Sequence, residues 1–390
     1  MLAGGVKKPP LPTFSSRLHD ERTASLVGSA LGVAFTTAFL TGLISHYLQH
    51  PPSWLAGHLW TRPTWGYRLT QGLHVTTGIA TIPLLLAKLW TVFPKLFEWP
   101  PVKSALHALE RLSILVLFAG AMFELVTGLL NAAQWYPWKF PFIQTHFWVA
   151  WVTVGALVVH IGVKAPEIQR GLRLGAAGRA AKAAELAEPA EPAGVSRRTF
   201  ILTTAVATGT VVVATVGQSV NTLRPVSVLS PRDVSVGPQA LPINRTATQA
   251  GVTRTAVDPG WKLDVVGPKP VSFTLAELAA LPQSMARLPI ACVEGWSKDA
   301  DWTGVRISDL LELCGAPKDA GLRVTSLEKN GPYGVTVIEA EYARDPLALL
   351  AIKVNGEPLA LDHGYPARII VPNRPGVLQT KWVERLEVLA

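Results

Sequence analysis

Cys292 occupies a position in this sequence at which a thiolate can do chemistry. It stands in Ala291-Cys292-Val293-Glu294-Gly295-Trp296-Ser297, where an apolar strand-like stretch gives way to a polar, glycine-containing turn. A thiolate in such a place binds a soft metal or attacks an electrophile. No histidine follows nearby to activate a nucleophile, and the nearest one is His363. We therefore interpret Cys292 as a candidate metal ligand, with a buried, inert cysteine as the alternative.

Cys314 is the only other cysteine of the chain. It ends an expected amphipathic helix from Ile307 to Cys314, so we interpret it as a buried thiol without a chemical role. Two cysteines are too few for a multi-cysteine metal site. A disulfide between Cys292 and Cys314 stays open as an alternative if this part of the chain lies outside the cell.

Ionisable residues within apolar segments form the second set of candidates, because such residues are costly in a membrane and functional by default. His74 lies in the second of four apolar spans, Glu124 in the third, and His146 and His160 in the fourth. Glu124 either accepts a proton from a quinol or makes an interhelical hydrogen bond. Each span has roughly the 20 residues that a bilayer requires. The spans run about Ala24 to Ser45, Leu69 to Ala87, Leu112 to Leu130 and Phe142 to Val163.

The spacing of His146 and His160 suits two haems. At 100° per residue the two side chains lie within about 40° of one helix face, and they are about 21 Å apart along the axis. One helix then presents an imidazole near each side of the membrane, as a four-helix bundle with two stacked haems requires.

The partners of these two histidines must come from other helices. His74 has the matching depth for the outer site, and His46, at the outer end of the first span, is a rival. For the inner site both His19 and His107 stay open. Under the alternative interpretation, histidines form interhelical hydrogen bonds or lie at the interface. We favour this alternative for His46, His50, His58 and His107.

This pattern resembles the dihaem cytochrome b subunits of quinone-linked formate dehydrogenases and hydrogenases over about residues 17–170. The resemblance implies two b haems and quinone as a redox partner. It also implies that His74 pairs with His146, and His19 with His160, as haem iron ligands.

The positive charge of the chain belongs to its first part. Residues 1–224 hold 19 Lys+Arg against 9 Asp+Glu, whereas residues 225–390 hold 17 against 18. With the amino terminus inside, the inner segments carry 15 Lys+Arg and the outer loops 3, which is a strong positive-inside asymmetry. The second part has no basic run interleaved with aromatic residues, so we expect no nucleic-acid partner.

The segment from Ser196 to Val220 separates the two parts. It begins Ser196-Arg197-Arg198-Thr199-Phe200 and continues as an uncharged run. Paired arginines before an apolar segment have the form of a twin-arginine export signal. Since the segment is long enough to span a bilayer, we interpret it as an uncleaved anchor helix. The alternative is that Arg197 and Arg198 are ordinary cytoplasmic anchors of a last transmembrane helix.

Residues 225–390 predict an α+β domain, because short apolar strands alternate with short helices. A capping box formed by Thr274 and Glu277 opens one helix, and Gly315 closes another. The expected strands are Trp261 to Val266, Ile290 to Val293, Val324 to Leu327, Val335 to Ile338, Leu350 to Val354, Arg368 to Val371 and Val383 to Val388.

This second part resembles the sulfite oxidase family of molybdenum enzymes, most of all bacterial periplasmic methionine sulfoxide reductase, over roughly residues 240–390. The Cys-Val-Glu-x-Trp-Ser block at Cys292 is specific to the family. The further motifs are Trp302-Thr303-Gly304-Val305, Val354-Asn355-Gly356-Glu357-Pro358-Leu359, Asp362-His363-Gly364-Tyr365-Pro366 and Lys381-Trp382. The resemblance implies that Cys292 binds molybdenum beside a molybdopterin and that Tyr333 faces the metal. It implies further that the pterin and its phosphate are held by Asn244, Arg245, Thr246, His363, Arg368 and Lys381.

We therefore expect a multi-domain chain, in which an all-α transmembrane four-helix cytochrome b bundle and a fifth anchor helix precede an α+β molybdopterin domain of the sulfite oxidase type. The expected parts are a cytoplasmic segment at 1–22, the bundle at 23–165, a cytoplasmic linker at 166–195, the anchor at 196–220 and an extracytoplasmic oxidoreductase domain at 225–390.

The expected protein lies in a bacterial inner membrane and moves electrons between quinone, b haems and a molybdopterin centre. That centre transfers an oxygen atom to or from a small molecule, and reduction of a sulfoxide-type substrate is favoured. A sulfite-oxidase-like dehydrogenase that passes electrons to quinone is one alternative. A non-catalytic membrane haem protein with an outer ligand-binding domain is the alternative of another class.

Overall fold

The computed structural model describes residues 17–55, 57–100, 102–182, 195–331 and 333–389. The chain divides into two compact units. The first comprises residues 1–40 and 74–215, and the second comprises residues 41–73 and 216–390. The stretch expected to be an outer loop between the first two spans thus belongs to the same unit as the carboxy-terminal domain.

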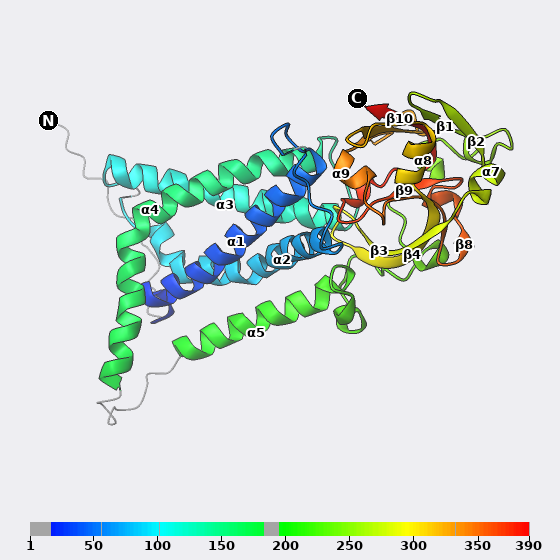
Figure 1. The fold of residues 1–390 in the computed structure, drawn as a ribbon. Coiled ribbons are helices and arrows are strands. Elements are labelled where there is room, and N and C mark those ends of the chain that lie inside the picture. Colours follow the sequence, from blue (N-terminus) through cyan, green and yellow to red (C-terminus); the bar gives the residue numbers. More distant parts are fainter. Residues whose placement is uncertain (1–16, 56, 101, 183–194, 332, 390) are drawn as a thin grey trace. The chain divides into compact units, whose positions relative to one another are not determined.

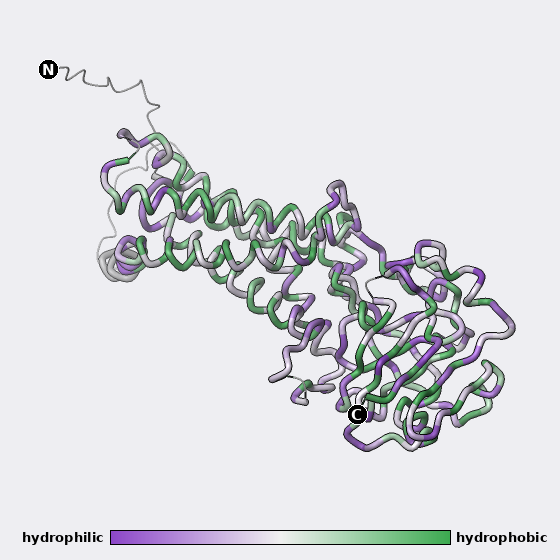
Figure 2. The backbone as a smooth tube through the Cα atoms, turned by 90° about the horizontal axis from the view of Figure 1, so that it is seen from above, coloured by the Kyte–Doolittle hydropathy of each residue, from purple (hydrophilic) through white to green (hydrophobic). Residues whose placement is uncertain are grey.

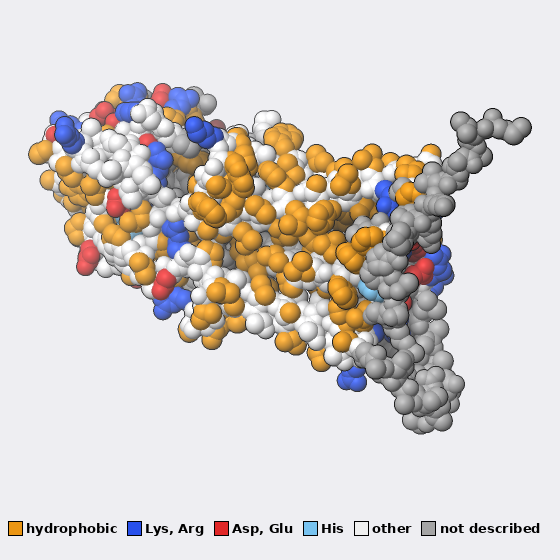
Figure 3. All heavy atoms as spheres, turned by 180° about the vertical axis from the view of Figure 1, so that it is seen from behind, with side chains coloured by type: hydrophobic (Ala, Val, Ile, Leu, Met, Phe, Trp, Pro, Cys, Tyr) orange, Lys and Arg blue, Asp and Glu red, His pale blue; other side chains and the backbone are white. Residues whose placement is uncertain are grey.

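Five long helices contain the expected spans (Figure 1). Among the described residues, these five are long and apolar enough to cross a membrane. Hydrophobic side chains cover much of the visible face of the helical part in Figure 3, and many residues along its helices are hydrophobic in Figure 2. An apolar outer surface of this extent suits contact with lipid. The helices are α1 (Glu21–Gln49), α2 (Gly66–Val92), α3 (Ala105–Ala132), α4 (Phe142–Lys182) and α5 (Arg197–Thr215).

Two boundaries differ from the expected ones. Helix α4 continues to Lys182, so the first part of the stretch expected to be a linker at 166–195 is helical, and residues 183–194 lie outside the described residues. Helix α5 ends at Thr215, before the expected end at Val220, and the chain continues in the 3-10 turns η3 (Val216–Gln218) and η4 (Asn221–Val226). The polar side chains of this stretch have a role in the second unit, as described below.

The second unit contains two five-stranded sheets. In the first, β1 and β10 are parallel and the other pairs are antiparallel. Its order is β2 (Val271–Thr274), β1 (Lys262–Val266), β10 (Val383–Leu389), β5 (Gly321–Ser326) and β6 (Val335–Ile338). The second has the antiparallel order β3 (Ser284–Ala291), β4 (Ser297–Arg306), β7 (Leu349–Val354) and β8 (Glu357–Pro358), with β9 (Arg368–Ile370) also on β7.

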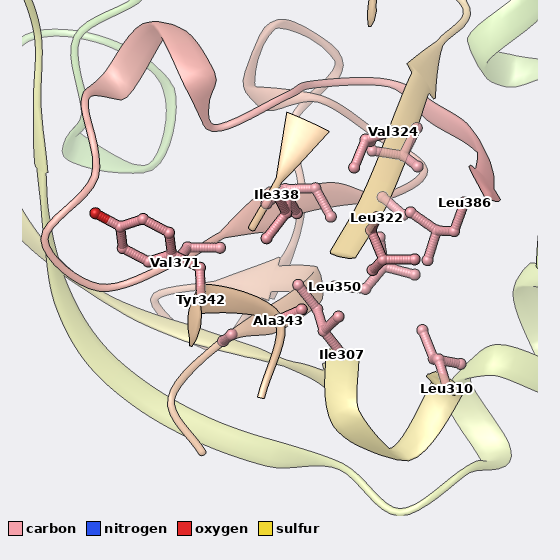
Figure 4. Packing of buried hydrophobic residues seen from close by; sticks show 14 of the residues in the cluster. Ile307, Leu310, Leu322, Val324, Ile338, Tyr342, Ala343, Leu350, Val371 and Leu386 are labelled. Atoms are coloured by element: carbon pink, nitrogen blue, oxygen red, sulfur yellow. The ribbon is translucent and has the colours of Figure 1, made fainter. Parts of the chain in front are cut away.

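Short helices and turns complete this unit and cover the apolar faces of the strands. In the core drawn in Figure 4, Ile307 and Leu310 of α8 pack with Leu322, Ile338 and other strand residues. The helices are α6 (Ala247–Ala250), α7 (Leu275–Ala280), α8 (Ile307–Leu313) and α9 (Ala340–Ala343). Its further 3-10 turns are η5 (Pro238–Ala240), η6 (Thr255–Val257), η7 (Leu361–His363) and η8 (Gly376–Leu378). The first unit contains the 3-10 turns η1 (Arg17–His19) and η2 (Phe93–Phe97).

Most of the predicted strands and both predicted helix ends are confirmed. Thr274 and Glu277 form both hydrogen bonds of the capping box, and Gly315, at φ +70°, follows α8. The sequence analysis missed β4, since acidic side chains such as Asp299 and Asp301 disfavour strands. Pairing with β3 on one side and β7 on the other overrides that preference.

Gly304 is required where β4 meets β7. A Cβ atom there would lie 2.0 Å from the Leu350 carbonyl oxygen and 2.6 Å from Ala351 Cα. We predict that Gly304→Ala lowers the free energy of unfolding of the second unit by about 1–3 kcal/mol, as overpacking typically does. Denaturant unfolding of the whole chain in detergent, followed by tryptophan fluorescence, measures the change. Gly260→Ala is the control, because its Cβ would meet only the Asp258 side chain, at 3.2 Å. Equal stability of the two variants would contradict the prediction.

Candidate functional site

Cys292 lies in the tight turn between β3 and β4. Its N–H donates to the Trp296 carbonyl oxygen at 2.9 Å, and the Gly295 N–H donates to the Cys292 carbonyl oxygen at 3.0 Å. Gly295 has φ +93°, a conformation that glycine adopts without strain. The Cys292 side chain is buried, with 1% of its surface exposed. The turn therefore holds one thiol in a fixed, dehydrated position.

The stretch after α5 holds this turn from the other side. Gln218 Nε2 donates to the Glu294 carbonyl oxygen at 3.1 Å, and Ser219 Oγ donates to the Gly295 carbonyl oxygen at 2.5 Å. The Glu294 carboxylate accepts from Trp296 Nε1 at 3.0 Å and lies 3.5 Å from Arg232. The sequence analysis assigned Gln218 and Ser219 to the end of an anchor helix and did not foresee this contact.

The surroundings of Cys292 suit a metal ligand. Burial, together with the charge of Glu294, raises the pKa of the Cys292 thiol, whereas the N–H groups of Glu294 and Val293 and the charge of Arg232 act in the opposite direction. A buried thiol of this kind stays protonated until a cation replaces the proton, because only a bound cation compensates the buried negative charge. The site thus fits a thiolate that forms upon metal binding.

Tyr333 and Cys314 occupy different environments. Tyr333 lies in the loop between β5 and β6, and burial together with Cys292 raises the pKa of its phenol. Tyr333 thus lies within electrostatic range of Cys292. Cys314 belongs to the other hydrophobic cluster of this unit, is fully buried, and donates to the Leu311 carbonyl oxygen at 3.3 Å. Both cysteines are free, so the disulfide alternative is wrong for this structure.

The residues expected to hold the pterin phosphate meet around Lys381. Lys381 Nζ donates to the carbonyl oxygens of Arg245 at 2.6 Å and Asp362 at 3.0 Å, and to Asn244 Oδ1 at 3.3 Å. Gly364, at φ +106°, lies between Lys381 and Arg368. A Cβ on Gly364 would be 3.0 Å from Lys381 Cβ and 3.1 Å from Arg368 Cβ. Residues separated by more than 100 positions are therefore assembled at one place.

Arg368 and Lys381 are buried cations: the charges of Asp362 and Glu328 act on Lys381, and the Arg368 guanidinium lies 5.0 Å from the centroid of the Trp302 ring. Arg368 donates to the His363 and Gln379 carbonyl oxygens at 3.1 and 3.3 Å, but its buried Nε has no partner within the described residues. Burial lowers the pKa of Arg368 to about 9, and burial together with the charge of Arg368 lowers the pKa of Lys381 to about 7. Buried charges of one sign are costly, so this cluster fits an anion such as a phosphate.

The other three predicted residues have defined contacts. His363 Nε2 donates to the Pro238 carbonyl oxygen at 2.7 Å, and burial lowers the pKa of His363 to about 4, so the ring is neutral. Arg245 forms an ion pair with Glu328 at 2.5 Å. Thr246 Oγ1 caps α6 by accepting from the Gln249 N–H at 3.1 Å. The structure thus gives Thr246 a capping role beside the expected site.

His74 and His146 come together in the first unit. Their ring centroids are 6.1 Å apart. Two imidazoles on opposite sides of one metal ion, each with a metal–nitrogen bond of about 2 Å, have centroids about 6 Å apart. His74 Nδ1 bonds to the Ala38 carbonyl oxygen at 2.8 Å, and His146 Nδ1 lies 2.9 Å from both Glu124 and Thr127 Oγ1. Such partners on Nδ1 leave Nε2 for the metal, as in many histidine–metal sites.

The contact of Glu124 with His146 joins α3 to α4. It is the interhelical hydrogen bond that was one of the two interpretations of Glu124. The glycines of these helices fall into two groups. A Cβ on Gly120 would lie 2.2 Å from Thr153 Oγ1, so this glycine serves helix packing. A Cβ on Gly32, Gly78 or Gly155 would meet nothing within 4 Å.

The inner pair remains a prediction. His160 Nδ1 is buried and has no partner within the described residues. His19 Nδ1 bonds to the Thr91 carbonyl oxygen at 3.2 Å, and its ring lies 6.0 Å from Trp90. The Lys103 N–H donates to His107 Nδ1 at 3.1 Å, and Arg111 Nε lies 3.5 Å from His107 Nε2, so both nitrogens have neighbours in the protein. The outer rival His46 lies against His50, with ring centroids 5.3 Å apart.

The sequence analysis also missed two residues of α2. The Tyr67 hydroxyl bonds to Ser45 Oγ at 3.0 Å and interacts electrostatically with Cys292 and Tyr333. Gln71 Nε2 donates to the Val293 carbonyl oxygen at 3.1 Å. The sequence analysis placed Gln71 in the second apolar span and Tyr67 just before it, and it gave neither residue a role. The nearby Arg62 and Arg68 could have indicated contacts with acidic residues elsewhere in the chain, but the sequence analysis counted them only for membrane topology.

Comparison with known proteins identifies the carboxy-terminal part. Residues 250–390 match the family described as oxidoreductase molybdopterin binding domain. The chain is 31% identical to the "Uncharacterized oxidoreductase YuiH" of Bacillus subtilis over 33% of this chain and 64% of that protein. It is 36% identical to a sulfite oxidase of Arabidopsis thaliana over 24% of this chain and 27% of that one.

A third relative is the "Putative protein-methionine-sulfoxide reductase subunit YedZ1" of Azospira oryzae, 32% identical over 30% of this chain and 44% of that protein. The chain covers less than two thirds of the length of each of these three relatives. Five apolar helices of spanning length suggest a membrane protein. The carboxy-terminal part, at residues 250–390, is an oxidoreductase molybdopterin binding domain, the domain of an enzyme.

Proposed function

We propose that this protein is a membrane-bound molybdenum oxidoreductase that exchanges electrons among quinone, b haems and a molybdopterin centre. The observation that carries the proposal is the buried thiol of Cys292 in the same unit as the partly compensated cations Arg368 and Lys381, within a molybdopterin binding domain. When bound, the molybdenum supplies two-electron oxygen-atom transfer. We place this domain outside the cytoplasm, on the evidence of the charge distribution and of Arg197 and Arg198.

In this proposal each predicted site residue has a separate role. Cys292 supplies the thiolate ligand of the metal. Arg368, Lys381 and Arg245 neutralise the phosphate of the pterin by charge-assisted hydrogen bonds. Neutral His363, fixed through its bond to the Pro238 carbonyl oxygen, orients the adjacent loop. Tyr333 donates a hydrogen bond toward the substrate oxygen beside the metal.

His74 and His146 are the proposed ligands of an outer b haem, and His19 and His160 those of an inner one. The outer pair is supported by the 6.1 Å separation of the ring centroids and by the acceptors at both Nδ1 atoms. Haems held by these histidines would supply single-electron transfer between a quinone and the two-electron centre. Helix α5 stays attached as an anchor, and the Arg197 ion pair with Asp20 and its bond to Thr23 Oγ1 support a permanent place in the fold.

The direction of electron flow separates two activities. Similarity to a putative protein-methionine-sulfoxide reductase subunit favours reduction of a sulfoxide, and similarity to sulfite oxidases favours oxidation of sulfite. We expect that a sulfoxide reoxidises chemically reduced haem in the purified protein, followed by the haem absorbance. Reduction of oxidised haem by sulfite would reverse the direction. A protein without molybdenum that shows neither reaction would instead support the non-catalytic ligand-binding alternative.

Cys292→Ser tests the metal ligand. A hydroxyl binds molybdenum more weakly than a thiolate, so we expect one sulfur ligand fewer by X-ray absorption. We also expect a loss of haem reoxidation by about 10- to 100-fold or more, the scale of lost ligand-shell contacts. Cys314→Ser, whose thiol is buried in the other cluster, is the matched control and should keep the sulfur count. An unchanged sulfur count in Cys292→Ser would overturn the assignment of this ligand.

His146→Ala tests the outer haem. Loss of one of two axial imidazoles removes the haem of that site, so we expect the haem content per chain to fall from two to one. Pyridine haemochrome spectra measure this content. His107→Ala is the control, because both nitrogens of His107 have partners in the protein. Full haem content in His146→Ala would refute its role as a ligand.

A further inference from the structure

The stretch from Thr41 to Leu73, here named the docking segment, is part of the compact unit that contains Cys292. It comprises the end of α1, the following loop and the first turns of α2. All contacts described below are internal to that unit. A stretch expected to be membrane helix and outer loop therefore contacts the oxidoreductase domain directly.

Two ion pairs fasten the docking segment to the domain. Arg62 binds Asp345 through two hydrogen bonds of 2.7 and 3.0 Å, and Arg68 binds Asp299 through two of 2.8 Å. Two-pronged arginine–carboxylate pairs define orientation as well as position. Asp345 is buried, so its pair with Arg62 is shielded from water on one side.

Backbone bonds and apolar packing complete the attachment. The Tyr67 N–H donates to Asn373 Oδ1 at 2.6 Å, and Asn373 Nδ2 donates to the Trp60 carbonyl oxygen at 2.7 Å. A Cβ on Gly66 would lie 2.8 Å from the same Oδ1, so Gly66 allows this close approach. Leu48, Leu59 and Tyr67 are buried in the hydrophobic cluster that also contains strand residues of the domain.

This attachment brings the start of α2 to the Cys292 turn, because Gln71, one helical turn after Tyr67, donates to the Val293 carbonyl oxygen at 3.1 Å. Only 2% of the Tyr67 surface is exposed, and its hydroxyl interacts electrostatically with Cys292 and Tyr333. Two separate parts of the chain thus each provide a tyrosine near the same thiol. Tyr333 comes from the loop before β6, and Tyr67 comes from α2. Gln71, one helical turn further along α2, bonds to the carbonyl oxygen next to Cys292 and keeps a buried Oε1 without a partner in the described residues.

The hydrogen bond between Ser45 and Tyr67 can have either hydroxyl as its donor. Ser45 Oγ accepts from Gln49 Nε2 at 3.2 Å and lies 3.0 Å from the Tyr67 oxygen. Ser45 can therefore donate its hydroxyl hydrogen to Tyr67. The Tyr67 hydroxyl then donates to an oxygen atom bound next to Cys292, since a phenol both donates and accepts.

We propose that the docking segment completes the active site and that the Tyr67 hydroxyl donates a hydrogen bond to the oxygen of the substrate beside Cys292, together with Tyr333. This inference rests on the proposed oxygen-atom transfer at that site. Tyr67 is thereby a catalytic residue supplied by a helix that continues into the first unit. A sulfoxide oxygen, which gains negative charge as its bond to sulfur weakens, is the kind of acceptor that such a donor stabilises.

Tyr67→Phe is the test, carried out on the complete chain with its cofactors. The variant removes one hydroxyl and keeps the ring, so molybdenum and haem contents should equal those of the unaltered protein. We expect kcat/KM for the oxygen donor to fall about tenfold or more, the effect of losing one hydrogen bond to a developing charge. We also expect the Mo(V) electron paramagnetic resonance spectrum to lose an exchangeable-proton coupling.

Two further variants sharpen the test. Tyr47→Phe removes a hydroxyl from the same segment and should leave both readouts unchanged. Ser45→Ala keeps the phenol and removes its neighbour, so it should produce a smaller change in the same direction. If Tyr67→Phe matches the unaltered protein in both readouts while Tyr333→Phe does not, the role of Tyr67 is overturned.

The proposed function fails in a different way. A protein that contains molybdenum but turns over neither sulfoxide nor sulfite would contradict the oxygen-atom transfer. The Mo(V) spectrum of Tyr67→Phe would still decide whether this hydroxyl contacts the metal-bound site. An altered spectrum would support the place of Tyr67 in the site, and an identical one would refute it.

Discussion

Burial of charge beside a single thiol is the constraint on which the second unit depends. Arg368 and Lys381 lie inside the protein with carbonyl oxygens as their main partners, and Arg368 Nε has none in the described residues. Cations in such surroundings are tolerated at a cost that a bound anion removes. The same burial keeps the thiol of Cys292 protonated until a cation arrives. These features fit the proposed ligand, which combines an anionic phosphate with a metal.

The first unit also contains buried polar groups, here histidine side chains on apolar helices. His74 and His146 have their Nδ1 atoms bound to Ala38, Glu124 and Thr127, so each ring has a defined tautomer and orientation. Polar groups of this kind are expensive among lipid chains unless they serve a purpose or have partners. Here each ring has a partner at Nδ1. The orientation of the two rings thus depends on hydrogen bonds to helices α1 and α3.

Local patterns accounted for a large part of the fold. Strand β6 was predicted with its observed bounds, and the capping box at Thr274 and the end of α8 at Gly315 were found where expected. These features depend on neighbours within a few positions, which a sequence displays directly. Strand β4 was missed because its acidic residues are unfavourable locally, and only its two partner strands make them acceptable. The start of the expected linker proved helical for a different reason, because the alanine-rich continuation of α4 to Lys182 has a high local helix propensity.

The sequence alone determined the five apolar helices, the α+β character of the second part and the motifs around Cys292, His363 and Lys381. It also placed His74 and His146 in position to form a pair. Only the tertiary structure decided that Tyr67 and Gln71 belong to the Cys292 site and that the stretch after α5 holds the Cys292 turn. These contacts join residues more than 70 positions apart, through single hydrogen bonds and ion pairs such as that of Arg68 with Asp299. No periodicity records such pairs, since either partner alone looks like an ordinary surface or membrane residue.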